Sequence, residues 1–198
     1  MRSCVAKHWS SFIVPSAEKL RLPDRLRPGL DIVSVGINPS ILSAQLGFNF
    51  ARPGNRFWPT LNAAHLIPID LKPGIAAVEA MVREYGIGFT DVVPRATARA
   101  DELRDEEFRR GARALKRKLM RYRPMIAWFH GTSAFQRYLE HAEGLKRKVA
   151  PGLQPERIGE TGVFVTPNPS GANPAANPKL LLPWYVELRK LRDRMRKP

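Results

Sequence analysis

The sequence predicts a single-domain, three-layer α/β/α sandwich around a mainly parallel central sheet of about four strands. Its 198 residues and 43% hydrophobic content suit one compact domain with a substantial core. Short apolar runs rich in β-branched residues alternate along the chain with longer amphipathic stretches. Because alternating strands and helices form parallel sheets covered on both faces, this order predicts the three layers. We assign residues 1–28 to a basic N-terminal extension and residues 29–198 to the domain.

Four segments have the composition of buried strands. Each is a short apolar run that ends in glycine, proline or a loop containing both. The expected strands lie in residues 31–36, 87–93, 124–131 and 162–171, and the last of these segments continues into a loop.

Five segments have the apolar spacing of helices. The first begins at Asn55, a candidate cap, and has Pro59 in its first turn, where proline is tolerated. The longest has acidic residues in its first turn and basic residues beyond, as the helix dipole favours. The expected helices span residues 55–66, 76–86, 105–124 and 132–140, followed by a last helix that carries Leu181, Tyr185, Leu188, Leu191 and Met195 on one side.

The charge balance points to a polyanionic partner. The chain has 33 Lys and Arg against 18 Asp and Glu, a net charge of +15. Such an excess is most often a sign of nucleic-acid binding and less often of an anionic membrane surface, while a generally basic solvated surface is the plainer interpretation. The basic stretches at residues 116–123 and 188–197 are by the same reasoning solvated helix faces or phosphate contacts.

Several classes of protein are excluded by composition. Cys4 is the only cysteine, which rules out an internal disulfide and a zinc site built on thiolates. The four histidines lack metal-ligand spacing, so we expect no metal and no cofactor. No apolar run approaches the ~18 residues of a membrane span, and the first residues lack the pattern of a secretory signal. We therefore expect a soluble cytoplasmic protein without a membrane partner, associated with the nucleoid if the source is prokaryotic.

Loops at one end of the predicted sheet are the expected binding site. In α/β sheets, ligands bind beyond the carboxyl ends of the strands. This rule selects "GINPS", "TDVVPRAT", "HGTS" and "TPNPSG", two of which contain Asn-Pro-Ser. None of them is a phosphate-binding P-loop or a dinucleotide fingerprint. His130 in the third loop could approach the pocket, but a satisfied structural histidine is the commoner case and is our expectation.

Asn38 and Phe50 stand out within the first of these regions. Asn38 precedes a proline, which favours an extended or turn conformation, and its carboxamide can hold a water or donate to a substrate oxygen. An ordinary turn is the alternative. Phe48 and Phe50 belong to a segment that makes a poor core helix, and we expect one of them to fix the loop to the core. Phe50 could instead present its face to a flat ring, a contact worth roughly 1–3 kcal/mol per base.

Three motifs in combination resemble a known family. They are "GINP" at residues 36–39, "GFNFARPGNRFW" at 47–58 and "NPSG" at 168–171. This combination, over about residues 26–193, resembles the mismatch-specific uracil and thymine DNA glycosylases, a branch of the uracil-DNA glycosylase superfamily. The resemblance implies a monofunctional base-excision-repair enzyme that flips uracil, or a related damaged pyrimidine, out of mismatched double-stranded DNA. Hydrolysis of the N-glycosidic bond would leave an abasic site, with no cofactor, and we expect a monomer.

The resemblance also implies roles for individual residues. Asn38 would position the attacking water, Phe50 would stack on the flipped base, and the backbones of Ile37 and Phe50 would bind the pyrimidine edge. Ser43 matches a pocket serine. Gly171 and Asn173 would face the estranged guanine through their backbones. The loop expected to enter the duplex comprises Asn168, Pro169, Ser170, Gly171, Ala172 and Asn173.

Two residues depart from the branch pattern. Ala172 stands where the branch has a bulky aliphatic residue, so we expect weaker wedging or a substitute wedge. Asp91 stands where Lys or Asn is expected, and a carboxylate there could deprotonate the water or stabilise the sugar cation. A turn-capping or solvent-facing Asp is the alternative. Two other functions remain open: a catalytically weak or inactive damage-recognising DNA-binding protein, and an RNA-binding role that rests on charge alone.

Overall fold

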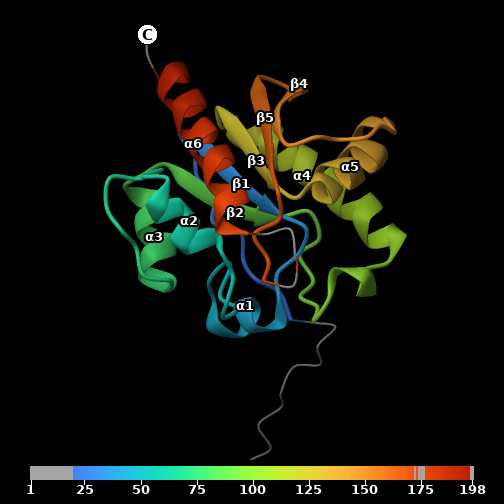
Figure 1. Cartoon of the computed structure of the whole chain (residues 1–198). Helices are drawn as coiled ribbons and strands as arrows, with labels where there is room; N and C mark the ends of the chain where they lie inside the picture. Colours follow the sequence, from blue (N-terminus) through green and yellow to red (C-terminus); the bar gives the residue numbers. More distant parts are fainter. Residues whose placement is uncertain (1–19, 172, 174–176, 197–198) are drawn as a thin grey trace, which may run out of the picture.

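The computed structural model describes residues 20–171, 173 and 177–196, and it contains a five-stranded sheet in the order β2-β1-β3-β5-β4 (Figure 1). β1, β2, β3 and β5 run parallel, and β4 pairs antiparallel with β5. The predicted fold class is confirmed, with one strand more than expected. The strands are β1 (Ile32–Gly36), β2 (Ile87–Asp91), β3 (Ile126–His130), β4 (Gly152–Ile158) and β5 (Thr161–Thr166).

Helices cover both faces of the sheet, as Figure 1 shows. Alternate strand residues enter two separate cores, because successive side chains of a strand point to opposite faces. On one face, Ile32 and Trp128 pack with α2, α3 and α6; on the other, Val33 and Phe129 pack with α4 and α5. The helices are α1 (Ile41–Leu46), α2 (Phe57–Ala63), α3 (Ile75–Arg83), α4 (Asp105–Tyr122), α5 (Thr132–Tyr138) and α6 (Pro178–Met195), with short turns at Ala100–Glu102 and Leu139–Glu143.

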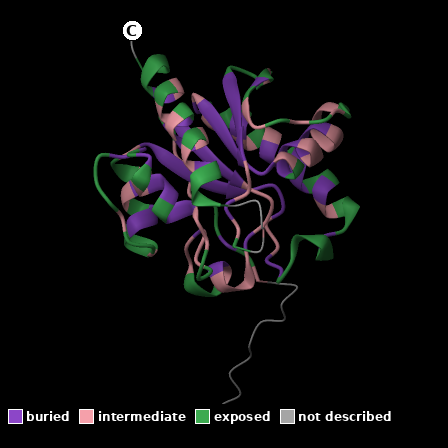
Figure 2. Cartoon of the chain, viewed as in Figure 1, coloured by how far each residue is buried: buried purple, intermediate pink, exposed green. Residues whose placement is uncertain are grey.

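The expected strands and helices occur where the sequence places them, with shorter ends. Asn55 acts at the start of α2 as expected, since the Phe57 N–H donates to its Oδ1 at 2.9 Å. Figure 2 shows the parallel strands as buried, which fits their continuous apolar sequences. No helix in the described part of the chain has the length and apolarity to cross a membrane.

The segment before β1 is joined to the sheet over its described part. Arg25 and Phe89 exchange two backbone hydrogen bonds of 2.8 and 3.0 Å, so Arg25 pairs with the outer edge of β2, while Arg21 bridges to Arg95 in the loop that follows. Leu22 is buried in the same segment. The division at residue 28 stays a prediction, and residues 1–19 lie outside the described residues.

The carboxyl ends of the four parallel strands meet at one edge of the sheet. Gly36 pairs in register with Asp91, and His130 pairs with Thr166. The chain then leaves each strand into one of the four loops selected from the sequence. This edge faces α1 in Figure 1, whereas the end of α6 lies at the opposite, amino edge.

Candidate active site

A cavity of about 780 Å³ opens at the carboxyl edge of the sheet, within the size range of ligand sites. Its walls come from all four loops that follow the parallel strands. The cavity therefore lies where the loop rule predicts a binding site. Eight of the residues predicted for the site line this cavity: Ile37, Asn38, Ser43, Phe50, Asp91, Asn168, Ser170 and Asn173.

The Asn38 carboxamide is held in one orientation. Its Nδ2 donates to Thr97 Oγ1 at 2.6 Å, to the Arg95 carbonyl at 3.1 Å and to the Pro39 carbonyl at 3.2 Å. Carbonyl oxygens can only accept, so these partners assign the NH₂ group to this side of the amide. Within the described residues no group donates to Oδ1, which leaves it free to accept from a water or substrate.

The Asp91 carboxyl is buried at the end of β2, beside the loop that carries Asn38. The residue is 9% exposed, and no hydrogen bond from a described residue reaches the carboxyl. Burial is the main cause that raises its pKa from 3.8 to about 7; the Asp24 charge adds to this, and the Lys118 charge opposes it. A carboxyl that titrates near neutral pH can accept a proton there. Neither the turn-capping nor the solvent-facing alternative describes this environment.

Gly36 leaves the space that the Asp91 carboxyl occupies. A Cβ at Gly36 would lie 2.3 Å from Asp91 Oδ1. We therefore expect Gly36→Ala to displace the carboxyl, to lower the free energy of unfolding by about 1–3 kcal/mol through overpacking, and to slow any reaction that needs Asp91. Urea denaturation and a single-turnover assay measure the two effects. Gly74→Ala is the control, since its Cβ would meet nothing within 4 Å; equal behaviour of the two variants would contradict the prediction.

Phe50 lies in the cavity wall with one face of its ring supported. Phe57 stacks on it at 4.0 Å between ring centroids and 11° between planes. The backbone of Phe50 has φ +58°, a left-handed conformation that is uncommon for an aromatic residue and is typical of functional sites. Phe48 and Phe50 both pack against the core shared by α2, α3 and α6, and of the two Phe50 also lines the cavity.

Backbone and hydroxyl groups around Phe50 are available for a ligand. Among the described residues, no backbone group bonds to the Ile37 N–H or to the N–H and C=O of Phe50, whereas the Ile37 carbonyl accepts from the Val93 N–H at 2.8 Å. Ser43 is buried in α1, and its Oγ accepts from the Ala51 N–H at 3.2 Å and contacts Ser40 Oγ at 3.0 Å. The cavity therefore offers several groups that match a polar ring edge.

The "NPSG" loop folds back on the segment before α2. The Arg56 N–H donates to the Pro169 carbonyl at 3.0 Å, and a Cβ at Gly171 would lie 2.9 Å from the Gly54 carbonyl oxygen. Asn168 caps the turn by accepting from the Ser170 N–H at 3.0 Å. Pro169 and Gly171 belong to the loop without lining the cavity. The prediction about Ala172 lies outside the described residues.

His130 lines the cavity, a position that the sequence analysis gave as the less common alternative to a structural histidine. Its Nε2 lies 2.8 Å from Ser34 Oγ, and its buried Nδ1 has no partner among the described residues. The expectation of a satisfied structural histidine is therefore wrong for Nδ1. Since Ser34 has no other acceptor there, its hydroxyl is expected to donate to Nε2, which places the proton on Nδ1. Burial lowers the pKa of His130 to about 3, so the ring is neutral.

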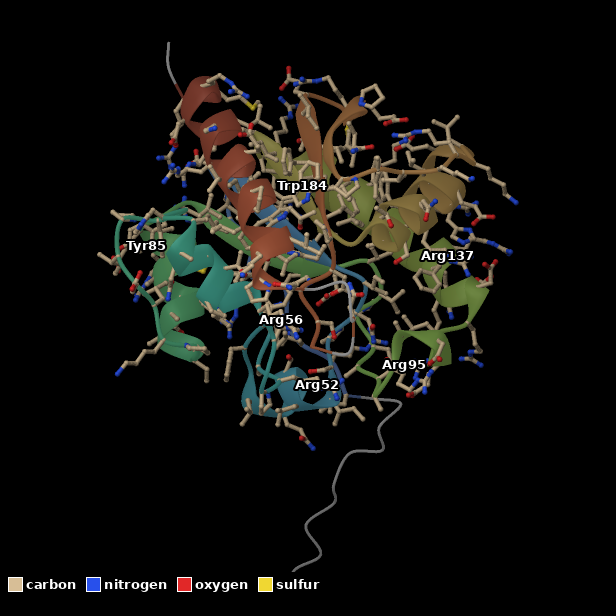
Figure 3. The ribbon with its side chains drawn as sticks, viewed as in Figure 1. Arg52, Arg56, Tyr85, Arg95, Arg137 and Trp184 are labelled. Atoms are coloured by element: carbon tan, nitrogen blue, oxygen red, sulfur yellow. The ribbon has the colours of Figure 1, made fainter. Side chains whose placement is uncertain are left out.

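Two of the four arginines in and around the cavity loops are paired with carboxylates. Arg95 binds both oxygens of Glu107 at 2.7 and 2.9 Å, and this pairing is the main cause that lowers the pKa of Glu107 to about 2. Arg99 pairs with Asp101. Figure 3 shows Arg52 and Arg56 beside the cavity loops, and neither forms an ion pair with a described residue; they donate to the Ala98 and Ser170 carbonyls at 3.5 Å. Within the described residues, no group of three or more potential metal-ligating side chains is found.

A family model and a solved structure both match this chain. Residues 23–189 match the family model of the uracil DNA glycosylase superfamily. Among solved structures, the chain is similar to the solution NMR structure of a putative uracil DNA glycosylase from Methanosarcina acetivorans, with a TM-score of 0.55 and 22% sequence identity. The match covers 87% of this chain and 98% of that one, which supports the fold. The family match spans most of the chain, and by this evidence the chain belongs to the uracil DNA glycosylase superfamily.

Proposed function

We propose that this protein is a monofunctional, mismatch-specific uracil DNA glycosylase of the uracil and thymine glycosylase branch. One observation carries the proposal: Asn38, Phe50 and Asp91 come from separate motifs and line one cavity at the carboxyl edge of the sheet. Superfamily membership supports a DNA glycosylase role in general. The branch motifs at residues 36–39, 47–58 and 168–171 support the narrower assignment.

The cavity suits a nucleotide that has left the duplex. A glycosylase reaches its target by flipping it out of the stack, which costs a few kcal/mol and least at a mismatch. The free face of Phe50 would carry the pyrimidine ring, and the Ile37 N–H, the Phe50 backbone and Ser43 Oγ would bind its edge. The loop of residues 168–173 would occupy the space that the flipped nucleotide leaves, as architectural wedges do.

The proposed chemistry is hydrolysis through a sugar cation. As the bond between C1′ and the base nitrogen breaks, its electron pair stays with the base and C1′ acquires oxocarbenium character. Asn38 Oδ1 would hold the attacking water, and Asp91 would take its proton as the new C–O bond forms. The neutral His130 would donate from Nδ1 to a carbonyl oxygen of the departing base. No lysine lines the described cavity, in keeping with a monofunctional enzyme that leaves an abasic site.

The two cationic residues that line the cavity, Arg52 and Arg99, are both exposed, and this placement has a physical reason. Phosphates on both sides of the nucleotide already favour the sugar cation, so cationic groups buried inside the site would oppose the reaction. Positive charge on the surface can instead contact those phosphates. Arg52 in the cavity wall and Arg56 beside the cavity loops lie in positions that suit such contacts.

His130→Phe is expected to lower the single-turnover rate about 10–100-fold, because the ring is kept while the N–H donor to the departing base is lost. The parent rate should show no step assignable to His130 between pH 5 and 9, since the pKa of the group lies near 3. Ser34→Ala/His130→Phe controls for the serine hydroxyl that the single change leaves unpaired. A parent-like rate in both variants would remove His130 from the mechanism.

A substrate panel tests the proposed function. Duplexes with U:G, U:A and T:G pairs and a uracil-containing single strand are incubated with the protein at one stated salt concentration, and abasic sites are revealed by alkaline cleavage. We expect cleavage to be fastest on U:G. Tight binding to U:G without abasic sites would instead favour the damage-recognising DNA-binding protein, and strong competition by RNA but not by duplex DNA would favour the RNA-binding role. Sedimentation of the free protein and of its DNA complex tests the expected monomer.

A further inference from the structure

A second cationic surface lies at the opposite end of the sheet from the cavity. α6 has 18 residues and is about 27 Å long at 1.5 Å per residue. It begins after the cavity loop of residues 168–173 and ends at the amino edge, where Arg196 forms an ion pair with Asp31, the residue before β1. The basic last turns of α6 therefore lie at the opposite end of the sheet from the cavity.

These last turns form one wall of a groove of about 630 Å³. The opposite walls are residues 65–68, between α2 and α3, and Glu84 and Tyr85, before β2. Figure 3 shows Tyr85 on the α3 side of the molecule, where side-chain nitrogen atoms gather near the end of α6. The cationic residues that line the groove are Arg189, Lys190, Arg192, Arg194 and Arg196.

The arginines of the groove differ in how they are held. Arg192 is 8% exposed and is fixed by the Leu66 carbonyl at 2.5 Å and by the Asp193 carboxylate at 2.8 and 2.9 Å. Arg189 and Arg194 also line the groove, and neither forms an ion pair with a described carboxylate. The pKa of Glu187 is lowered mainly by its hydrogen bond to Lys190, and the Arg194 charge adds to this effect. Two carboxylates line the groove, and Asp193 is already engaged by Arg192.

The position of the groove indicates a separate partner contact. Arginines without an ion pair to a described residue occur at both edges of the sheet: Arg52 and Arg56 beside the cavity, and Arg189 and Arg194 in the groove. The basic stretch at the end of the chain is placed where a duplex bound over the cavity is not expected to reach. Arginines without carboxylate partners beside a groove provide the sequence-independent phosphate contacts that dominate non-specific DNA binding.

We propose that the amino-edge groove is a second binding site for the phosphate backbone of duplex DNA, so that one molecule holds two DNA segments during transfer between them. The groove would capture an incoming segment while the first is still bound at the cavity edge. Dissociation from the first segment then depends on the concentration of the second. This inference requires DNA as the partner and does not require base excision.

The test is a transfer experiment with uracil-free DNA. The parent protein is bound to a fluorescent duplex, and dissociation is followed after unlabelled duplex is added at increasing concentration. We expect the parent rate to rise at least about threefold over a tenfold range of competitor, and Arg189→Gln/Arg194→Gln to show a rise below about 1.5-fold. The single-turnover rate of the variant on a saturating U:G duplex should stay within about twofold of the parent.

Arg117→Gln/Arg121→Gln is the matched control, since it removes the same charge from exposed arginines of α4 on the other face of the sheet. The control should keep the competitor dependence of the parent. A parent rate independent of competitor, a groove variant that keeps the dependence, or an equal loss in the control would each overturn the proposal. A parent that transfers normally but releases no uracil would disprove the proposed excision activity and leave the groove assignment standing.

Discussion

Asp91→Asn is expected to slow base excision at pH 8 by about 10²–10³-fold, the range of a lost general base. The carboxyl lies in the cavity, no described donor engages it, and its pKa is raised to about 7 mainly by burial. At pH 8 it is mostly ionised and can accept the proton of the attacking water. The amide of asparagine has nearly the same shape and cannot accept that proton at this pH.

The pH dependence of the single-turnover rate tests whether the Asp91 carboxyl is the general base. The parent single-turnover rate should rise about tenfold per pH unit below pH 7 and level off above it, whereas the rate of Asp91→Asn should be nearly independent of pH. Asp101→Asn is the control, because Asp101 is an exposed residue of the cavity mouth paired with Arg99. A variant as fast as the parent, or an unchanged profile, would remove Asp91 from the mechanism.

Asp91→Asn should lower activity at pH 8 but raise the free energy of unfolding relative to the parent as the pH rises. The raised pKa means that the folded protein holds the Asp91 proton more tightly than the unfolded chain does, so the contribution of Asp91 to stability falls as pH rises from about 4 to 7. Asparagine carries no such charge. The free energy of unfolding of Asp91→Asn, relative to the parent, should therefore increase by about 2–3 kcal/mol between pH 5 and pH 8. Urea denaturation at the two pH values measures this difference.

Asn38→Ala is expected to lower the single-turnover rate about 10²-fold or more, through loss of the oxygen that holds the water. Asn38→Asp should be no better, because one carboxylate oxygen would face the Arg95 and Pro39 carbonyl oxygens that now accept from Nδ2. Thr97→Val should have a smaller effect, since it removes one of the three partners of the amide.

Asn62→Ala provides the control for this pair of changes. Asn62 also uses its whole carboxamide, with bonds of 3.1 and 3.2 Å to the Leu71 backbone, but it does not line the cavity. The Asn62→Ala variant should be less stable than the parent, but its single-turnover rate per folded molecule should be unchanged. The assignment of Asn38 would be wrong if Asn38→Ala lowered stability and rate only as Asn62→Ala does.

The elements that could be predicted from the sequence are those whose pattern of apolar residues is clear. The four parallel strands are continuous apolar runs, and their helices show clear apolar faces. β4 escaped prediction because only two of its seven residues, Gln154 and Ile158, are buried, and Pro155 interrupts it. α1 escaped because it has six residues in a region that reads as a loop, and its ends depend on Ser40 as cap and on Gly47 with φ +76°.

The sequence predicted which residues lie at the candidate site, but not the hydrogen bonds that orient them. The rule that ligands bind at the carboxyl edge, together with the motifs, predicted that Asn38, Phe50 and Asp91 lie close together. The orientation of Asn38 depends on Thr97, which is 59 residues away, and the tautomer of His130 depends on Ser34, which is 96 residues away. Periodicity and composition carry no signal for such pairings, which arise only when the strands lie side by side.

The most direct test of the central claim is a crystal structure of the Asp91→Asn variant bound to a duplex with a single U:G pair. We predict that the uracil has left the helix and lies on the face of Phe50 opposite Phe57, with its edge at the Ile37 N–H and C1′ close to Asn38 Oδ1. A uracil still stacked in the duplex, or a complex held at the amino-edge groove with the cavity empty, would contradict the assignment of this cavity as the site of base excision.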